Sequence, residues 1–257
     1  MLDLQKAGIL KRISAYILDM ILVMILATGF ACLFSWMFGY AQHETMLDER
    51  RDFYIEKYDL EEYANGFELT EEEYNKLSDA QKEAYIAATT EFEKDAEANH
   101  AWGMMISLTF LILTLSILLT YLVLEFAIPL FLGGGMSVGR KVFSVGIMHE
   151  NHVKVKPTAL FVRSILGKCT VETMVPLYLV LLILFGELGI VGTVVLIGML
   201  ALQLILVFTT KTHATIHDLL AHTVAVDYSS QMIFEDEEAL LRYKSERARE
   251  AAEATDY

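Results

Sequence analysis

An aspartate inside an apolar run is the first feature of this sequence that could do chemistry. Asp19 follows Arg12 by seven residues, and the apolar run continues beyond it through LVMILATGFACLFSWMF. An ionised Asp at the centre of a membrane-spanning helix costs about 2.5–3.5 kcal/mol, and less nearer the end of the helix. Because a helical Arg12 side chain extends back toward the N-terminus, we expect Asp19 to find its partner in another segment. Arg163 and Arg140 are the candidates.

Other charged residues stand near the ends of later apolar runs. Glu125 lies one turn before Pro129, Glu172 begins a third run, and His217 with Asp218 follows a fourth. If the runs are antiparallel helices of one bundle, these residues lie in the same half of it as Asp19. The sequence therefore predicts a polar centre in one half of a membrane protein.

Two roles for this polar centre stay open. An intramembrane carboxylate can accept a proton or a cation, and a nearby arginine can alternately neutralise it. Asp19 and Glu125 would then be the acceptors, with Arg12 and Asp218 as a gate pair. Alternatively, Arg12, Asp19 and Asp218 form a structural lock, whose disruption would cost roughly 3–5 kcal/mol.

Other kinds of chemistry fit the sequence poorly. His213, His217 and His222 have a spacing that can bind zinc, but a structural role is favoured. The glycines between Gly134 and Gly139 have the spacing of a phosphate-binding loop, but Arg140 and Lys141 follow in place of Lys and Ser/Thr. No nucleophile–base set is evident. We expect no enzyme, no metal site and no cofactor.

The distribution of apolar residues predicts four membrane-spanning helices. The chain has 257 residues, of which 54% are hydrophobic, and residues 101–124 carry no charge. About 20 apolar residues suffice to cross a bilayer. The run from Met174 to Phe208 is too long for one helix and breaks near Gly186-Glu187-Leu188-Gly189, although three spans remain an alternative. The expected spans are about 13–38, 102–132, 165–186 and 188–210.

Loop charges predict the orientation of these spans. Residues 133–170 hold six Lys and Arg against Glu150 alone, whereas residues 39–100 hold 18 Asp and Glu against six Lys and Arg. Positively charged flanks remain in the cytoplasm. We therefore expect both termini and the 133–170 segment to be cytoplasmic, and 39–100 to be extracellular. The net charge of −14 arises mostly in that one segment and gives no reason to expect nucleic acid as a partner.

The two segments outside the spans have local patterns of their own. Thr70 with Glu73 and Ser78 with Gln81 both form capping boxes, which predict helices starting near residues 71 and 79 in the acidic segment. In the basic segment, alternation around residues 142–147 and 153–155 predicts two short strands about a turn. The following stretch PTALFVRSILGK predicts an amphipathic helix on the membrane surface before the third span.

Three stretches together resemble the RDD family of membrane proteins, which is named for one arginine and two aspartates. The first is Arg12 with Ala15-Tyr16 and Asp19. The second is Gly135-Met136-Ser137-Val138-Gly139-Arg140-Lys141 with the later Arg163, similar to a G-x-T-x-G-K loop and the stretch beyond it. The third is HDLLAHTV from His217, similar to the family's H-D-x-x-A-G-T signature. The resemblance covers about residues 5–227, interrupted by the long 39–100 insertion.

The resemblance implies that Arg12, Asp19 and Asp218 are the name-giving residues. Ser137 stands where the family commonly has Thr, and His222 where it commonly has Gly. The family implies transport, with cation/proton exchange proposed for some members, and a subunit role in membrane complexes for others. We therefore expect small-solute or cation transport, with a non-catalytic adaptor as the alternative.

The sequence thus predicts an all-α integral membrane protein of the cell membrane. It would have four transmembrane helices, an extracellular acidic helical insertion and a cytoplasmic β-turn/amphipathic-helix segment. Its expected partners are the lipid bilayer and either further copies of itself or other membrane proteins. The expected segments are 1–38, 39–100, 101–132, 133–164, 165–210 and 211–257.

Overall fold

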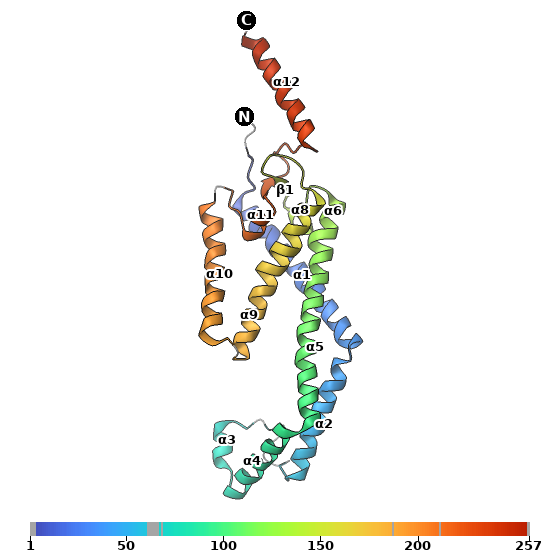
Figure 1. Ribbon diagram of the computed structural model, residues 1–257, viewed down its shortest axis with the longest axis vertical. Coiled ribbons are helices and arrows are strands. Elements are labelled where there is room, and N and C mark those ends of the chain that lie inside the picture. Colours follow the sequence, from blue (N-terminus) through green and yellow to red (C-terminus); the bar gives the residue numbers. More distant parts are fainter. Residues whose placement is uncertain (1–3, 61–66, 68, 187, 211, 256–257) are drawn as a thin grey trace. The chain divides into compact units, whose positions relative to one another are not determined.

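The protein is mainly helical and divides into two compact units (Figure 1). The computed structural model describes residues 4–60, 67, 69–186, 188–210 and 212–255, so Glu187 of the expected break lies outside the described residues. Unit 1 comprises residues 1–28 and 117–257, and unit 2 comprises residues 29–116. The helices α1 (Ile9–Met37) and α5 (Ala96–Tyr121) each contribute to both units.

Four helices in the described part of the chain are long and apolar enough to cross a membrane, as the sequence predicted. They are α1, the helix Ala96–Leu132, the helix Pro157–Leu184 and α10 (Gly189–Thr209). Along α10, Ile190, Val191 and Phe208 are exposed, which suits a helix that faces lipid. The expectation of an all-α membrane protein with four spans is confirmed.

The third span differs from the expectation, because no separate surface helix precedes it. Pro157–Leu184 is one continuous helix composed of α8 (Pro157–Phe161), the π-helical segment η3 (Val162–Met174) and α9 (Val175–Leu184). The stretch looked amphipathic because Arg163 and Lys168 lie in it. Both side chains are buried against acidic residues rather than facing water.

The second span contains a similar wide turn just before a proline. It runs from α5 through the π-helical segment η2 (Leu122–Ala127) to α6 (Ile128–Leu132). Pro129 has no N–H to donate to the carbonyl of Glu125, four residues earlier. The Ser164 hydroxyl of η3 donates to that carbonyl at 2.6 Å instead. The two spans are thus joined by a hydrogen bond where the proline interrupts one helix.

A two-stranded antiparallel sheet lies beyond the ends of these spans in unit 1. Strand β1 (Val145–His149) pairs with β2 (Thr223–Asp227), with Ile147 opposite Ala225. The sequence predicted a hairpin with residues 153–155, but only an isolated bridge joins Met148 to Lys154. Instead, β1 pairs with β2, the strand that follows the fourth span. Val224, Ala225 and Val226 of β2 are buried in this pairing.

Three shorter or peripheral helices complete unit 1. Helices α7 (Val138–Val142) and α11 (Ile216–Leu220) lie immediately before the two strands. The charged residues near the C-terminus form helix α12 (Glu237–Thr255). Its Leu240 is buried, and Tyr243 packs on Phe234 with ring centroids 5.3 Å apart.

Unit 2 is a helical assembly with its own small core. It contains α2 (Tyr40–Lys57), α3 (Glu71–Lys76) and α4 (Asp79–Lys94), and both predicted capping boxes are present. Helix α2 was not predicted. Ile55 and Leu60 pack with Ala88 of α4 in one cluster of this core. Asp95 joins two helices, since it accepts hydrogen bonds from Arg50 and from the Tyr54 hydroxyl at 2.9 Å.

Candidate functional site

The carboxylate of Asp19 is held by two neutral donors. It accepts hydrogen bonds from the Ser137 hydroxyl and from the Gly139 amide at 2.7 Å, and Asp19 is only 5% exposed. Ser137 is the N-cap of α7, so its hydroxyl is fixed by the start of that helix. The prediction that Arg163 or Arg140 pairs directly with Asp19 is wrong. Arg140 instead donates its Nε to Ser137 at 2.9 Å.

Gly139 permits this contact because α7 crosses close to α1. A Cβ atom at Gly139 would lie 2.9 Å from the Asp19 Cγ and closer still to the Ala15 carbonyl oxygen. Contacts that short do not occur in folded proteins without a shift of the neighbouring atoms. The close approach of α1 therefore explains why position 139 of the loop motif is a glycine. Ser137 and Gly139 together attach α7 to Asp19 through hydrogen bonds.

Glu125 lies at the centre of a doubly paired cluster. Its carboxylate forms ion pairs with both Arg140 and Lys168 and is 1% exposed. Arg140 also donates to the Gly135 carbonyl at 3.1 Å. Three predicted residues of the loop motif, Gly135, Ser137 and Arg140, thus form one hydrogen-bonded network with Glu125 and Asp19.

Asp218 is the second doubly paired carboxylate. It forms an ion pair with Arg163 and lies 3.8 Å from Arg12, whose guanidinium also donates to the His213 carbonyl at 2.9 Å. Burial alone would raise the pKa of Asp218, but the Arg163 charge outweighs it and holds this pKa far below its ordinary value. The predicted meeting of α1 with the segment after the fourth span is confirmed by these contacts.

A carboxylate–histidine pair lies beside these clusters. Glu172 accepts hydrogen bonds from the His217 backbone amide at 2.9 Å and its ring Nδ1 at 2.7 Å. Burial, reinforced by the nearby Arg163 charge, lowers the pKa of His217, so the imidazole is neutral at pH 7. Gly167 gives α11 room to pack here, since a Cβ atom would lie 2.6 Å from the His217 Cβ.

Two of the three histidines with zinc-like spacing are hydrogen-bonded to other groups. His213 is hydrogen-bonded to the Val207 carbonyl at 2.9 Å, and His217 to Glu172. The His149 ring is hydrogen-bonded to the His222 carbonyl. No group of three metal-binding side chains occurs among the described residues.

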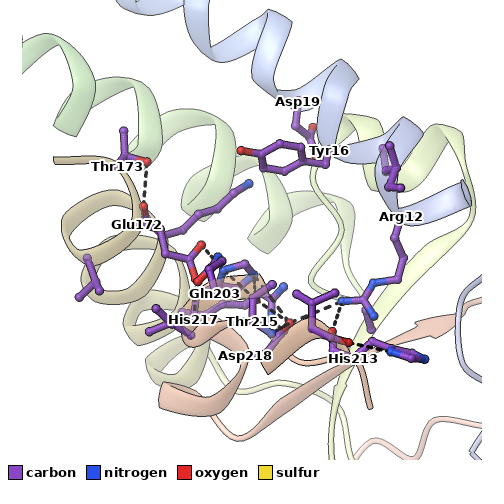
Figure 2. Close-up of a pocket in the computed structure, with 18 of the residues that line it drawn as sticks. Arg12, Tyr16, Asp19, Glu172, Thr173, Gln203, His213, Thr215, His217 and Asp218 are labelled. Atoms are coloured by element: carbon purple, nitrogen blue, oxygen red, sulfur yellow. Dashed lines mark hydrogen bonds and ion pairs between the residues drawn. The ribbon is translucent and has the colours of Figure 1, made fainter. Parts of the chain in front are cut away.

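A pocket of about 590 Å³ lies within unit 1. Several of these groups border it (Figure 2). We call it the α1–α10 pocket. Asp19 and Tyr16 border it from α1, Glu172 from η3, and His217 from α11. Apolar side chains complete its walls. They include Ile13, Val171, Pro176, Leu200, Leu204 and Phe208.

Sequence reasoning missed one polar residue of this pocket, Gln203 on α10. Its side chain is a further hydrogen-bonding neighbour of Glu172, while its Oε1 atom is buried with no hydrogen-bond partner among the described residues. An amide inside the otherwise apolar run 189–209 was the signal that could have identified it. Lys168 also borders the pocket, and its ammonium lies 5.7 Å from the centre of the Tyr16 ring.

The charges around the pocket are unequally distributed. Four buried or half-buried cations contact only two of the four carboxylates: Arg140 and Lys168 contact Glu125, and Arg163 and Arg12 contact Asp218. The contacts of Asp19 and Glu172 described above are with neutral donors. These two carboxylates border the pocket, so it has anionic groups whose charge is not cancelled by a direct ion pair.

Comparison with known sequences identifies the framework in which this site occurs. The RDD family pattern matches residues 6–222 of the chain, which include all six of the predicted charged and histidine residues. No curated protein and no solved structure matches the chain.

Proposed function

Because this chain belongs to the RDD family and has helices suited to crossing a membrane, we propose that it transports a small cation coupled to protons. The observation that carries the proposal is the pair of carboxylates, Asp19 and Glu172, that border the pocket and form no ion pair with a Lys or Arg among the described residues. An intramembrane carboxylate with neutral neighbours can exchange a proton for another cation.

The proposal assigns different roles to the four carboxylates. Asp19 and Glu172 would accept the proton or the cation, and the neutral His217 imidazole would pass a proton to or from Glu172, its hydrogen-bond partner. Glu125 and Asp218 would hold the helices together, because each already contacts two cations. The contact of Arg12 with Asp218 would close the pocket on that side.

The orientation predicted from the loop charges completes the proposal. The end of unit 1 that carries Arg12 and Asp218 would face the cytoplasm, and unit 2 would lie outside the cell membrane. Labelling single-cysteine variants in intact cells tests this orientation. A membrane-impermeant reagent should modify Glu93→Cys before lysis and Glu235→Cys only after lysis, and the reverse order would contradict it.

Flux through the purified protein tests the transport proposal. The protein is reconstituted into vesicles that contain a pH-sensitive dye, and a sodium or potassium gradient is applied. We expect a change in internal pH that is lost with Asp19→Asn or Glu172→Gln while the folded yield and melting temperature stay near those of the parent. The matched control is Glu235→Gln, since the Glu235 side chain is 78% exposed.

The alternative structural role gives a different result in the same experiment. If Asp19 only fastens α1 to α7, Asp19→Asn lowers folded yield, and the surviving folded protein behaves like the parent. No pH change with the parent protein under any imposed gradient would contradict transport. It would favour the adaptor role, for which the separately packed unit 2 offers a binding surface.

A further inference from the structure

The size and lining of the α1–α10 pocket suit an organic molecule better than a bare ion. A water molecule occupies about 30 Å³ of liquid volume, and drug-sized ligands typically occupy pockets of 300–1,000 Å³. The pocket encloses about 590 Å³, and its walls are predominantly apolar side chains from α1 and α10. A hydrated or dehydrated metal ion would leave most of these walls without a contact.

Two of the polar side chains that line the pocket, Gln203 and Glu172, have hydrogen-bond acceptor atoms. Gln203 Oε1 is buried and has no donor among the described residues. The Glu172 carboxylate is hydrogen-bonded to His217, which burial keeps neutral at pH 7, so its negative charge has no direct ion pair there. A buried acceptor without a donor is unfavourable, and a ligand N–H would supply the missing donor.

From these contacts we propose that the α1–α10 pocket binds a hydrophobic organic cation that carries N–H donors. Its charged nitrogen lies near Glu172 and Asp19, an N–H group donates to Gln203 Oε1, and its apolar part contacts Leu200, Leu204 and the neighbouring wall residues. This inference rests on the proposed cation transport and specifies the class of substrate.

Other occupants match the pocket less well. An anionic lipid head group needs free cations, but Arg12, Arg163 and Lys168 already contact carboxylates. An uncharged acyl chain would fill the apolar part but leave Gln203 Oε1 without a donor. Among the described residues no three His, Cys, Asp or Glu side chains form a group that could hold a metal ion, so an ion transported through the pocket would not fill it.

Binding of ethidium, an aromatic cation with two amino groups, tests the inference. The purified protein in nanodiscs is titrated with ethidium and, separately, with the uncharged aromatic N-phenyl-1-naphthylamine, and fluorescence polarisation is recorded. We expect ethidium to bind with at least tenfold higher affinity than the uncharged compound. Gln203→Leu should weaken ethidium binding about tenfold because it removes an acceptor for an amino group. Glu172→Gln should weaken it by a similar factor because it removes a negative charge beside the cation.

Two controls separate binding from folding. Glu235→Gln changes an exposed carboxylate and should bind ethidium like the parent. Gln203→Leu introduces no unpaired charge, so it remains informative if Glu172→Gln fails to fold. Equal binding of the two compounds, or ethidium binding that Gln203→Leu leaves unchanged, would contradict the inference and indicate a lipid-like occupant.

Flux measurements on the same protein, reconstituted into vesicles as described above, distinguish this inference from the proposed function. Cation-driven pH change without ethidium binding would leave transport standing and overturn the organic-cation assignment. Ethidium binding that depends on Gln203 and Glu172, but without any flux, would support the binding site and contradict transport.

Discussion

Neutralising Glu125 is predicted to destabilise unit 1 without abolishing the proposed transport by the molecules that still fold. Glu125 is 1% exposed and contacts Arg140 and Lys168 at once. Glu125→Gln preserves the size of the side chain but removes its charge. Arg140 and Lys168 donate to different oxygens of the carboxylate, so one of these cations would then face the amide NH2 group, which cannot accept.

The expected loss follows from leaving buried charges without a counter-ion. Removing one partner of a buried ion pair costs about 3–5 kcal/mol. The amide oxygen of the new Gln still accepts from Arg140 or Lys168, so we expect a value near the lower end. For a unit of this size, each kcal/mol lowers the melting temperature by about 2–4 °C. Glu125→Gln should therefore lower it by about 6 °C or more.

The assay is thermal unfolding of the purified protein in detergent, followed by intrinsic fluorescence. Adding Lys168→Met to Glu125→Gln removes one of the unpaired cations and should recover part of the loss. Glu235→Gln is the matched control and should leave the melting temperature unchanged. A melting temperature within 2 °C of the parent, together with lost flux, would refute the reasoning and make Glu125 a substrate acceptor.

Two further predictions concern packing and pH. Gly167→Ala should lower the free energy of unfolding by about 1–3 kcal/mol, because the new Cβ atom would collide with His217. Gly198→Ala is the control and should not destabilise the protein, since no atom lies within 4 Å of the new Cβ atom. Equal melting temperatures of the two variants would contradict this packing. In unit 2, the hydrogen bond from Arg50 lowers the pKa of Asp95 from 3.8 to about 2. Its stabilisation is therefore complete above pH 4 and lost as the pH falls toward 2. Hydrogen exchange of the backbone amides in residues 40–57 should be faster in Asp95→Asn than in the parent at pH 7. This difference in exchange rate should shrink below pH 4. A difference that does not depend on pH would contradict the role of the Asp95 charge.

The sequence predicted which charged residues gather but not how they pair. Arg12 and Asp218 could be placed together because loop charges and apolar runs determine which helix ends meet. The predicted partner of Asp19 was wrong because the real contact depends on the close crossing of α1 and α7 at Gly139. No periodic pattern in the sequence indicates such a crossing. Gln203 was missed because a single amide in an apolar span carries no spacing signal.

Helix periodicity also misled the interpretation of residues 157–168. In an α-helix, residues five apart point about 140° away from each other, which separates Arg163 from Lys168. The wider π-helical turns of η3 bring such residues closer to one face, and both cations reach buried carboxylates. The apolar pattern of a sequence predicts the length of a membrane-spanning helix. Which side chains meet depends also on where the helix changes from α-helical to π-helical turns, and the apolar pattern did not indicate that change.

The bond from Ser164 to the Glu125 carbonyl has a consequence for biosynthesis. Pro129 leaves that carbonyl without its usual donor, and the replacement lies 39 positions later in the chain. While the ribosome is still making the intervening residues, this carbonyl lacks the donor that Ser164 supplies in the folded protein. The bond forms once the third span lies beside the second, so the two spans are expected to enter the membrane as a pair.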